Sequence, residues 1–143
     1  MPPEEKVRNP GHVDGELAEF HTAADLVGHN CRVSYTHGLY KYDLIADKED
    51  ELIRVQVKKA RQDPDEKWKY SIPTDGYADD EIDLFAGYAP EPDEVFYVLV
   101  EETGSEFRVL DKTGKNMNEH NRDLANLIDD YSFERAFQNL TGE

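Results

Sequence analysis

Residues 52–59 of this 143-residue chain read Leu-Ile-Arg-Val-Gln-Val-Lys-Lys. The side chains of this stretch alternate between apolar and polar, which is typical of a β-strand with one face on a core. Gln56 and Lys58 therefore share one face of the strand, while Val55 and Val57 take the other. The polar pair on one face is the first candidate for chemistry.

A second strand-like run, Tyr-Asp-Leu-Ile-Ala-Asp at residues 42–47, precedes the first. If the two runs are neighbouring strands, Asp43, Gln56 and Lys58 meet at one end of a sheet. Carboxylate and amide oxygens are ligands that a divalent cation prefers, and such a cation neutralises a phosphodiester and lowers the pKa of a bound water. An ammonium group beside them can orient that water or stabilise charge on the phosphate. This arrangement predicts a nuclease site.

A helix is predicted from about residue 12 to Gly28, because apolar side chains recur there at steps of three and four residues. The repeating residues are Val13, Leu17, Phe20, Ala24 and Val27. We expect this stripe to pack on the sheet. Glu16 and Glu19 lie beside the stripe, and we predict that Glu19 reaches the strand ends and supplies a further carboxylate.

Three motifs in this order resemble those of the PD-(D/E)xK nuclease superfamily. They are Gly-Glu-Leu-Ala-Glu at 15–19, Tyr-Asp-Leu-Ile at 42–45 and Val-Gln-Val-Lys at 55–58. The chain is most similar to the branch that holds archaeal Holliday junction resolvases and group I intron-associated homing endonucleases carrying QxK. The resemblance covers residues 11–60 and extends more loosely to residue 100. It implies an α/β fold, with a restriction-endonuclease-like core whose mixed central sheet is flanked by helices.

The resemblance also implies a function, a metal-dependent DNA endonuclease that hydrolyses phosphodiester bonds. Glu19, Asp43, Gln56 and Lys58 would form its active site, and Glu19, Asp43 and Gln56 would hold Mg²⁺ or Mn²⁺. Gln56 stands where most members of the superfamily have a carboxylate. A neutral amide binds a cation less strongly, although the QxK branch is described as active.

The length fits a single domain over residues 1–143, with a core at about 11–110 and a helical segment at about 117–140. Ser132 is a possible second helix start within that segment. Gly104 predicts a hairpin that joins the strand at 95–100 to residues 107–110. The one cysteine, Cys31, excludes an internal disulfide, and we expect it to serve packing in a cytoplasmic protein. No apolar run is long enough to span a bilayer, and residues 1–5 lack a signal-peptide core.

The charge of the chain is unusual for a DNA-binding protein, because 32 acidic residues outnumber 16 basic ones and give a net charge of −16. One explanation is a halophilic host. Molar salt shortens the screening length to about 3 Å, so acidic residues far from the contact no longer repel DNA. Two alternatives remain open. The chain is either a nucleic-acid-binding module that keeps the nuclease fold with little catalysis, as Gln56 suggests, or an acidic protein-interaction domain that mimics DNA.

Basic residues nevertheless gather after the proposed metal strand. The predicted phosphate contacts are Lys41, Lys59, Arg61, Lys67 and Lys69. We interpret Trp68 and Tyr70 among them as core residues of another strand.

The substrate stays open between branched and duplex DNA. A junction resolvase must cut two symmetric strands, so we predict a homodimer. A homing or restriction-type enzyme needs base readout in a groove.

Overall fold

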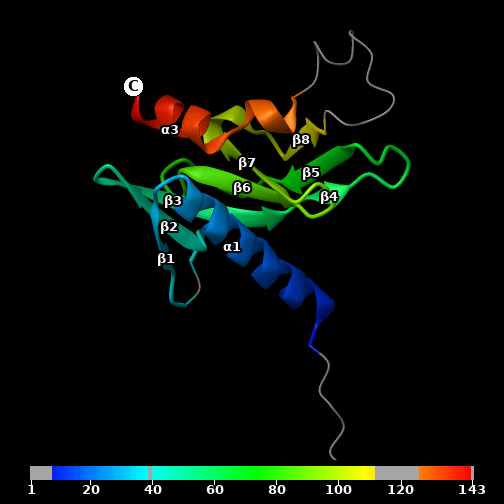
Figure 1. Cartoon of the computed structure of the whole chain (residues 1–143), viewed down its shortest axis with the longest axis horizontal. Coiled ribbons are helices and arrows are strands. Elements are labelled where there is room, and N and C mark those ends of the chain that lie inside the picture. The colour runs from blue at the N-terminus through cyan, green and yellow to red at the C-terminus, as the bar shows by residue number, and fades with distance from the viewer. Residues whose placement is uncertain (1–7, 39, 112–125, 143) are drawn as a thin grey trace, which may run out of the picture.

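The computed structural model describes residues 8–38, 40–111 and 126–142, and these form three layers (Figure 1). The helices α1 (Pro10–Gly28) and α3 (Phe133–Thr141) make the first layer. The second is a five-stranded sheet of β1 (Arg32–Tyr35), β2 (Leu44–Lys48), β3 (Glu51–Lys59), β6 (Leu84–Ala89) and β7 (Glu94–Leu99). The third is a three-stranded sheet of β4 (Arg61–Gln62), β5 (Lys69–Pro73) and β8 (Glu106–Leu110). Two 3-10 helices, η1 (Val100–Glu102) and η2 (Ile128–Asp130), connect the layers.

The five-stranded sheet is mixed, as predicted, in the order β1-β2-β3-β6-β7. β3 runs parallel to β6, and the other neighbouring pairs are antiparallel. The stretch at 52–59 lies at the middle of this sheet. β2 and β3 form a tight hairpin whose two turn residues, Glu49 and Asp50, adopt positive φ angles of 52° and 67°. The predicted α/β fold with a mixed central sheet is confirmed.

Two hydrophobic cores lie on the two faces of the central sheet. Ile53, Val55 and Val57 of β3 face the helices in the first core. The second core fills the space between the two sheets. Gln56 pairs with Phe85, which belongs to the second core, so the polar face of β3 points toward the three-stranded sheet. The apolar side chains of β3 are therefore buried against the helices, while its polar side chains are half-buried on the side of the second sheet.

The inner face of α1 differs from the one that the sequence predicts. The side chains buried against the sheet are Ala18, Thr22 and Leu26. This row is one residue, or about 100°, away from the predicted stripe. Two small side chains in the row let the helix lie close to a sheet that already presents the bulky Tyr88 and Tyr97 to the same core.

The predicted stripe of α1 points away from the core, so this expectation was wrong. Leu17, Phe20 and Val27 are 47%, 57% and 59% exposed. Periodicity identifies a helix with an apolar stripe, but it does not say what covers the stripe. The bounds of the helix itself agree with the prediction to within two residues.

The predicted hairpin through Gly104 was also wrong. β8 pairs with β5 in the second sheet, and Phe107 lies opposite Ile72 there. The residue that follows η2 lies beyond the outer edge of β7 instead, because the Tyr97 N–H donates a hydrogen bond to the Tyr131 carbonyl at 2.8 Å. Phe107 and Val109 are buried in the second core, so burial of these side chains sends the strand to the other layer.

The C-terminal segment agrees with the sequence in part. Ser132 caps α3 by accepting a hydrogen bond from the Arg135 N–H at 3.2 Å, which confirms the predicted helix start. Gly142 ends the helix in the left-handed conformation. Residues 126–131 form a bridge and a 3-10 turn, not an α-helix. The predicted helical residues 117–125 lie outside the described part of the chain.

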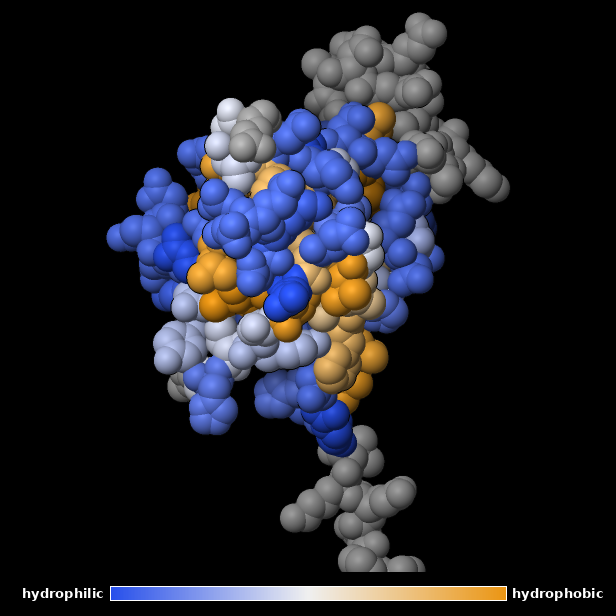
Figure 2. Space-filling view, turned by 60° about the vertical axis from the view of Figure 1, so that its left-hand side comes forward, coloured by the Kyte–Doolittle hydropathy of each residue, from blue (hydrophilic) through white to orange (hydrophobic). Residues whose placement is uncertain are grey.

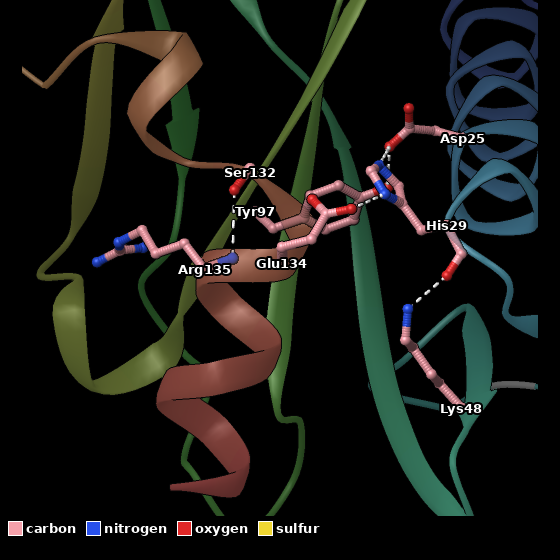
Figure 3. Close-up of polar contacts among 7 residues, drawn as sticks. All are labelled: Asp25, His29, Lys48, Tyr97, Ser132, Glu134 and Arg135. Atoms are coloured by element: carbon pink, nitrogen blue, oxygen red, sulfur yellow. Dashed lines mark hydrogen bonds and ion pairs between the residues drawn. The ribbon is translucent and has the colours of Figure 1, made fainter. Parts of the chain in front are cut away.

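A polar network fixes the C-terminal end of α1 against β7 and α3 (Figure 3). Asp25 accepts a hydrogen bond from the Tyr97 hydroxyl at 2.7 Å, and burial followed by the nearby Asp25 charge raises the Tyr97 pKa. The two ring nitrogens of His29 lie 3.4 Å from Asp25 Oδ2 and 2.5 Å from Glu134 Oε1. Lys48 Nζ donates to the His29 carbonyl at 2.6 Å. These contacts join the C-terminal end of α1 to β7, α3 and β2.

Cys31 behaves as the sequence predicts. It is buried and unpaired in the first core, and burial raises the pKa of its thiol. Among the described helices, none combines the length and apolar character needed to cross a membrane.

Thr22 offers a test of the inner face of α1. Its hydroxyl is fully buried and has no hydrogen-bond partner among the described residues. Thr22→Val keeps the shape and removes the unsatisfied group, so we expect the free energy of unfolding to rise by about 1 kcal/mol. Urea denaturation of the two proteins measures this difference. A loss of stability would show that the hydroxyl has a partner and that α1 is rotated from its described position.

Candidate active site

Asp43 lies at the point where β3 continues beyond its pairing with β2. The paired part of β2 begins at Leu44, opposite Val55, so the last four residues of β3 extend past it. The Asp43 carboxylate fills part of this gap, because its Oδ2 accepts the Val57 N–H at 3.0 Å. The Asp43 N–H donates to the Val55 carbonyl at 2.9 Å. The carboxylate is thus fixed to β3 by both its backbone and its side chain.

Thr36 holds the chain that leads into Asp43. Its N–H donates to the Asp43 carbonyl at 3.1 Å, and its hydroxyl donates to the Tyr42 carbonyl at 3.0 Å. These contacts join the end of β1 to the start of β2. The position of the carboxylate is therefore set by two strands, which gives the site the rigidity that catalysis requires.

Gln56 and Lys58 share the face of β3 that points toward the second sheet, as the alternation predicts. Lys58 Nζ lies 5.0 Å from the centroid of the Tyr77 ring, and Lys41 Nζ lies 5.3 Å from the same centroid. Tyr77 is held edge-on against Phe85 at 5.1 Å. Two lysines from different elements thus meet over one aromatic ring beside Asp43. No local pattern indicated this role for Tyr77, because the ring comes from a loop distant along the chain from Lys41 and Lys58.

Glu19 comes from the helical layer and is half-buried. Burial raises the pKa of its carboxyl, and the negative charges of Asp43 and Glu16 raise it further. Burial also raises the pKa of Asp43, although the Val57 N–H and the Lys58 ammonium act in the opposite direction. The structure therefore brings the Glu19 charge within the electrostatic range of Asp43. Two carboxylates removed from water and facing like charge are costly unless a cation accompanies them.

The donor atoms at this site fit a hard divalent cation. Asp43 offers a carboxylate with one oxygen oriented by a backbone N–H, and Glu19 offers a second carboxylate. Gln56 Nε2 lies 3.5 Å from the Val57 carbonyl, so the amide oxygen points elsewhere. Among the described residues, no three His, Cys, Asp or Glu side chains converge as metal ligands. A cation here would therefore depend on the Gln56 amide, backbone carbonyls and water to complete its shell.

The predicted DNA-binding lysines fall on different faces of the sheet. Lys41 lies at the site, where its Nζ donates to the Gly76 carbonyl at 3.3 Å and lies 3.8 Å from Glu81. Lys59 points to the opposite face from Lys58, because its Nζ lies 3.0 Å from Asp14 Oδ2 on α1. The structure brings Lys41 to the candidate site and takes Lys59 away from it.

Arg61 and Lys69 line a hollow of about 240 Å³ on the outer face of the three-stranded sheet. Arg61, Ser71 and Arg108 form a row across its three strands. Arg108 was not predicted from the sequence, since β8 was expected in another pairing. Lys69 forms an ion pair with Glu66, and Lys67 is exposed. This hollow follows Lys58 by only three residues along the chain.

A further hollow of about 520 Å³ lies between α1, β7 and the start of α3. Its lining includes His21, His29, Tyr88 and Asp93, and none of Glu19, Asp43, Gln56 or Lys58. The candidate active site lies instead at the end of β3, where its last residues extend past β2.

Comparisons with known proteins agree with this geometry. The family model for PD-(D/E)XK endonucleases matches residues 11–134. Among solved structures, the fold is similar to that of a bacterial homing endonuclease, I-Ssp6803I, with a TM-score of 0.68 and 20% sequence identity. That similarity covers 78% of this chain and 84% of the other. No curated protein matches this sequence. Because the family match spans most of the chain, the protein belongs to the PD-(D/E)XK endonuclease family.

Proposed function

We propose that the protein is a metal-dependent endonuclease that hydrolyses DNA phosphodiester bonds at the edge of β3. The observation that carries this proposal is the hydrogen bond from the Val57 N–H to Asp43 Oδ2. It holds a carboxylate beside the two residues, Gln56 and Lys58, that the same strand presents on its polar face. Membership of the family supports the hydrolytic activity, and the choice of Mg²⁺ or Mn²⁺ rests on the oxygen donors.

Each residue of the site has a separate task. Asp43, Gln56 and Glu19 provide the oxygen atoms that would hold the cation. When bound, a divalent cation neutralises the phosphate and lowers the pKa of water. Lys58 stabilises the charge that develops on the phosphate oxygens, because its ammonium group lies on the same strand face as Gln56. Lys41, whose Nζ lies 5.3 Å from the centroid of the Tyr77 ring, contributes a second positive charge for the DNA backbone.

Basic residues lie at the site and shortly after it along the chain, although the net charge is −16. Lys41 and Lys58 lie at the site. Arg61, Lys69 and Arg108 line the hollow on the outer face of the three-stranded sheet, where Lys69 and Arg108 form ion pairs with Glu66 and Glu106. DNA that crosses from β3 onto the three-stranded sheet would meet these groups in succession. Distant acidic residues are screened in concentrated salt, so a halophilic host fits DNA binding by this chain.

The amide of Gln56 favours one alternative, a DNA-binding module with little catalysis. A neutral amide in place of a carboxylate leaves the site with one negative charge less to hold a cation. This alternative predicts that the protein binds DNA in Mg²⁺ without cutting it. Gln56→Glu distinguishes the two functions, since it would create activity in an inactive module and preserve activity in an active enzyme.

Asp43→Asn tests the metal ligand directly. The amide keeps an oxygen that can accept the Val57 N–H but loses the negative charge, so we expect cleavage to fall at least about 100-fold with folding intact. The assay uses a four-way junction and a linear duplex, with Mg²⁺ or Mn²⁺, from low to molar KCl. Cutting of the junction would indicate a resolvase, and cutting of the duplex would indicate a site-specific enzyme. Undiminished cleavage by the variant would remove Asp43 from the site.

Lys59 provides a matched control for Lys58, because the two consecutive lysines point to opposite faces of β3. Lys58→Met should lower the turnover by about 100-fold or more, since it removes the cation that faces the phosphate. Lys59→Met removes the same charge on the side of α1 and should leave turnover nearly unchanged. Single-turnover cleavage with saturating enzyme measures both. Equal losses in the two variants would mean that the lysines act through general charge and not through position.

The raised pKa values of Asp43 and Glu19 predict a pH dependence of stability. A carboxyl whose folded pKa is raised contributes stability below its ordinary pKa, and that contribution is lost as pH rises through the raised value. The melting temperature of the metal-free protein should therefore fall as the pH rises from about 4, the ordinary carboxyl pKa, through the raised pKa values of Asp43 and Glu19. Asp43→Asn should flatten part of this decline, and Mg²⁺ should reverse it only in the wild type. Identical melting profiles with and without Mg²⁺ would contradict a metal site.

A further inference from the structure

Exposed aromatic rings lie close in sequence to the carboxylates of the candidate site. Of the Phe, Tyr and Trp side chains that the structure describes, three are exposed, namely Phe20, Tyr35 and Tyr40. Phe20 follows Glu19 on α1, whose exposed apolar side is visible in Figure 2, and its ring centroid lies 6.2 Å from that of Tyr35. Tyr40 comes three residues before Asp43. A nucleotide base that reaches the proposed metal ligands would therefore find aromatic surface on which to stack.

The Tyr40 ring is fixed in place although the residue is 62% exposed. It stacks on the Tyr42 ring, with centroids 5.9 Å apart and planes inclined by 26°. Tyr42 packs against the second core, and its carbonyl accepts a hydrogen bond from the Thr36 hydroxyl at 3.0 Å. Lys41, between the two tyrosines, donates from its Nζ to the Gly76 carbonyl at 3.3 Å. A ring held in this way loses little conformational freedom when a ligand covers it.

Positive charge lies next to Tyr40. Lys41 follows it in the chain, and Lys41 Nζ and Lys58 Nζ lie 5.3 and 5.0 Å from the centroid of the Tyr77 ring. α1 contains no lysine or arginine, so the Phe20 ring has no such neighbour on its own helix. Aromatic rings beside cationic groups are the combination that holds single-stranded nucleic acid, because bases stack on the rings and phosphates face the cations. Tyr40 is therefore the exposed ring best placed to meet a DNA strand at this site.

Base pairing decides whether a base can reach such a ring. Within a continuous duplex, both faces of each base are covered by its neighbours, and exposing one face costs the energy of unstacking. At a flap or a bulge the base is already unpaired, and most of that cost is absent. Every base has an aromatic face, so stacking on a ring selects the unpaired state and not a sequence.

We propose that Tyr40 stacks on an unpaired DNA base beside the phosphodiester that the site cleaves. The protein then prefers a duplex that carries a flap or a bulge to a continuous duplex. This inference rests on the proposed endonuclease and names the substrate class of the same site. Lys41 and Lys58 contact phosphates of the strand whose base lies on Tyr40.

DNA binding by the whole chain tests this preference without any need for cleavage. Fluorescence anisotropy compares a duplex that carries a single-stranded flap with a continuous duplex of the same sequence. Ca²⁺ replaces Mg²⁺ in this assay, because Ca²⁺ also binds carboxylate oxygens. We expect the wild type to bind the flap DNA about ten-fold more tightly. Tyr40→Phe keeps the ring and should keep this ratio, whereas Tyr40→Leu keeps only apolar bulk and should bring the ratio close to one.

Two further measurements assign the effect to this ring. Phe20→Leu is the matched control, because it removes an exposed ring that has no lysine or arginine on its helix, and it should leave the ratio unchanged. Photo-crosslinking from 5-iododeoxyuridine at the first unpaired position, followed by mass spectrometry of the peptides, should modify Tyr40. Crosslinks that form only at other residues would contradict the stacking.

The outcomes separate failure of the stacking from failure of the proposed function. Equal binding of the two DNAs by the wild type overturns the stacking. So does equal weakening of both DNAs in Tyr40→Leu, because a ring that only shapes the loop would act on both. If the wild type cuts the two DNAs at the same rate, and Tyr40→Leu does so as well, the endonuclease holds and the stacking fails. If the flap is bound through Tyr40 but no DNA is cut, the stacking holds and the endonuclease proposal fails. Circular dichroism spectra establish that the variants are folded.

Discussion

The hydrogen bond between the Val57 N–H and the Asp43 carboxylate is the interaction on which the site depends. It exists because β2 begins one residue after Asp43, while β3 continues for four residues beyond its pairing with β2. A backbone donor that the ladder would otherwise use is therefore left for a side chain. The same offset leaves the last residues of β3, which include Gln56 and Lys58, without a partner strand on the side of β2.

The cost of this arrangement is electrostatic. Asp43 and Glu19 are both partly removed from water, and the charge of Asp43 raises the pKa of Glu19. A fold selected only for stability would not keep two such carboxylates together, because each is destabilised at neutral pH. A divalent cation offsets both penalties at once. Asp25, on the same helix as Glu19, differs in this respect. Its carboxylate accepts a hydrogen bond from the Tyr97 hydroxyl, and this contact joins α1 to β7.

Much of the fold could be predicted from short-range patterns. Alternation along β3 identified the polar face, and the motif order identified the nuclease family, because both depend on residues close together in the sequence. The Ser132 cap was likewise visible. The pairing of β8 with β5 was not visible, since strand pairing depends on which core Phe107 enters. The role of Tyr77 depends on a loop folding back between Lys41 and Lys58, and no local pattern encodes that contact.

The rotation of α1 shows a different limit of sequence analysis. An apolar stripe predicts that a helix face is covered, but not that the same chain covers it. Ala18 and Thr22 face the sheet because small side chains allow close packing against Tyr88 and Tyr97, and the larger row is left outside. Helix α1 therefore packs on the sheet through its small side chains, while its larger apolar row is exposed among the described residues.

If Asp43, Gln56 and Glu19 hold a divalent cation for DNA hydrolysis, the bound ion should be visible by electron paramagnetic resonance of Mn²⁺, because free and protein-bound ions give distinct signals. Titration of Mn²⁺ into the protein with DNA should reveal bound ion in the wild type and a much weaker site in Asp43→Asn and Glu19→Gln. Equal Mn²⁺ binding by all three proteins would contradict the account.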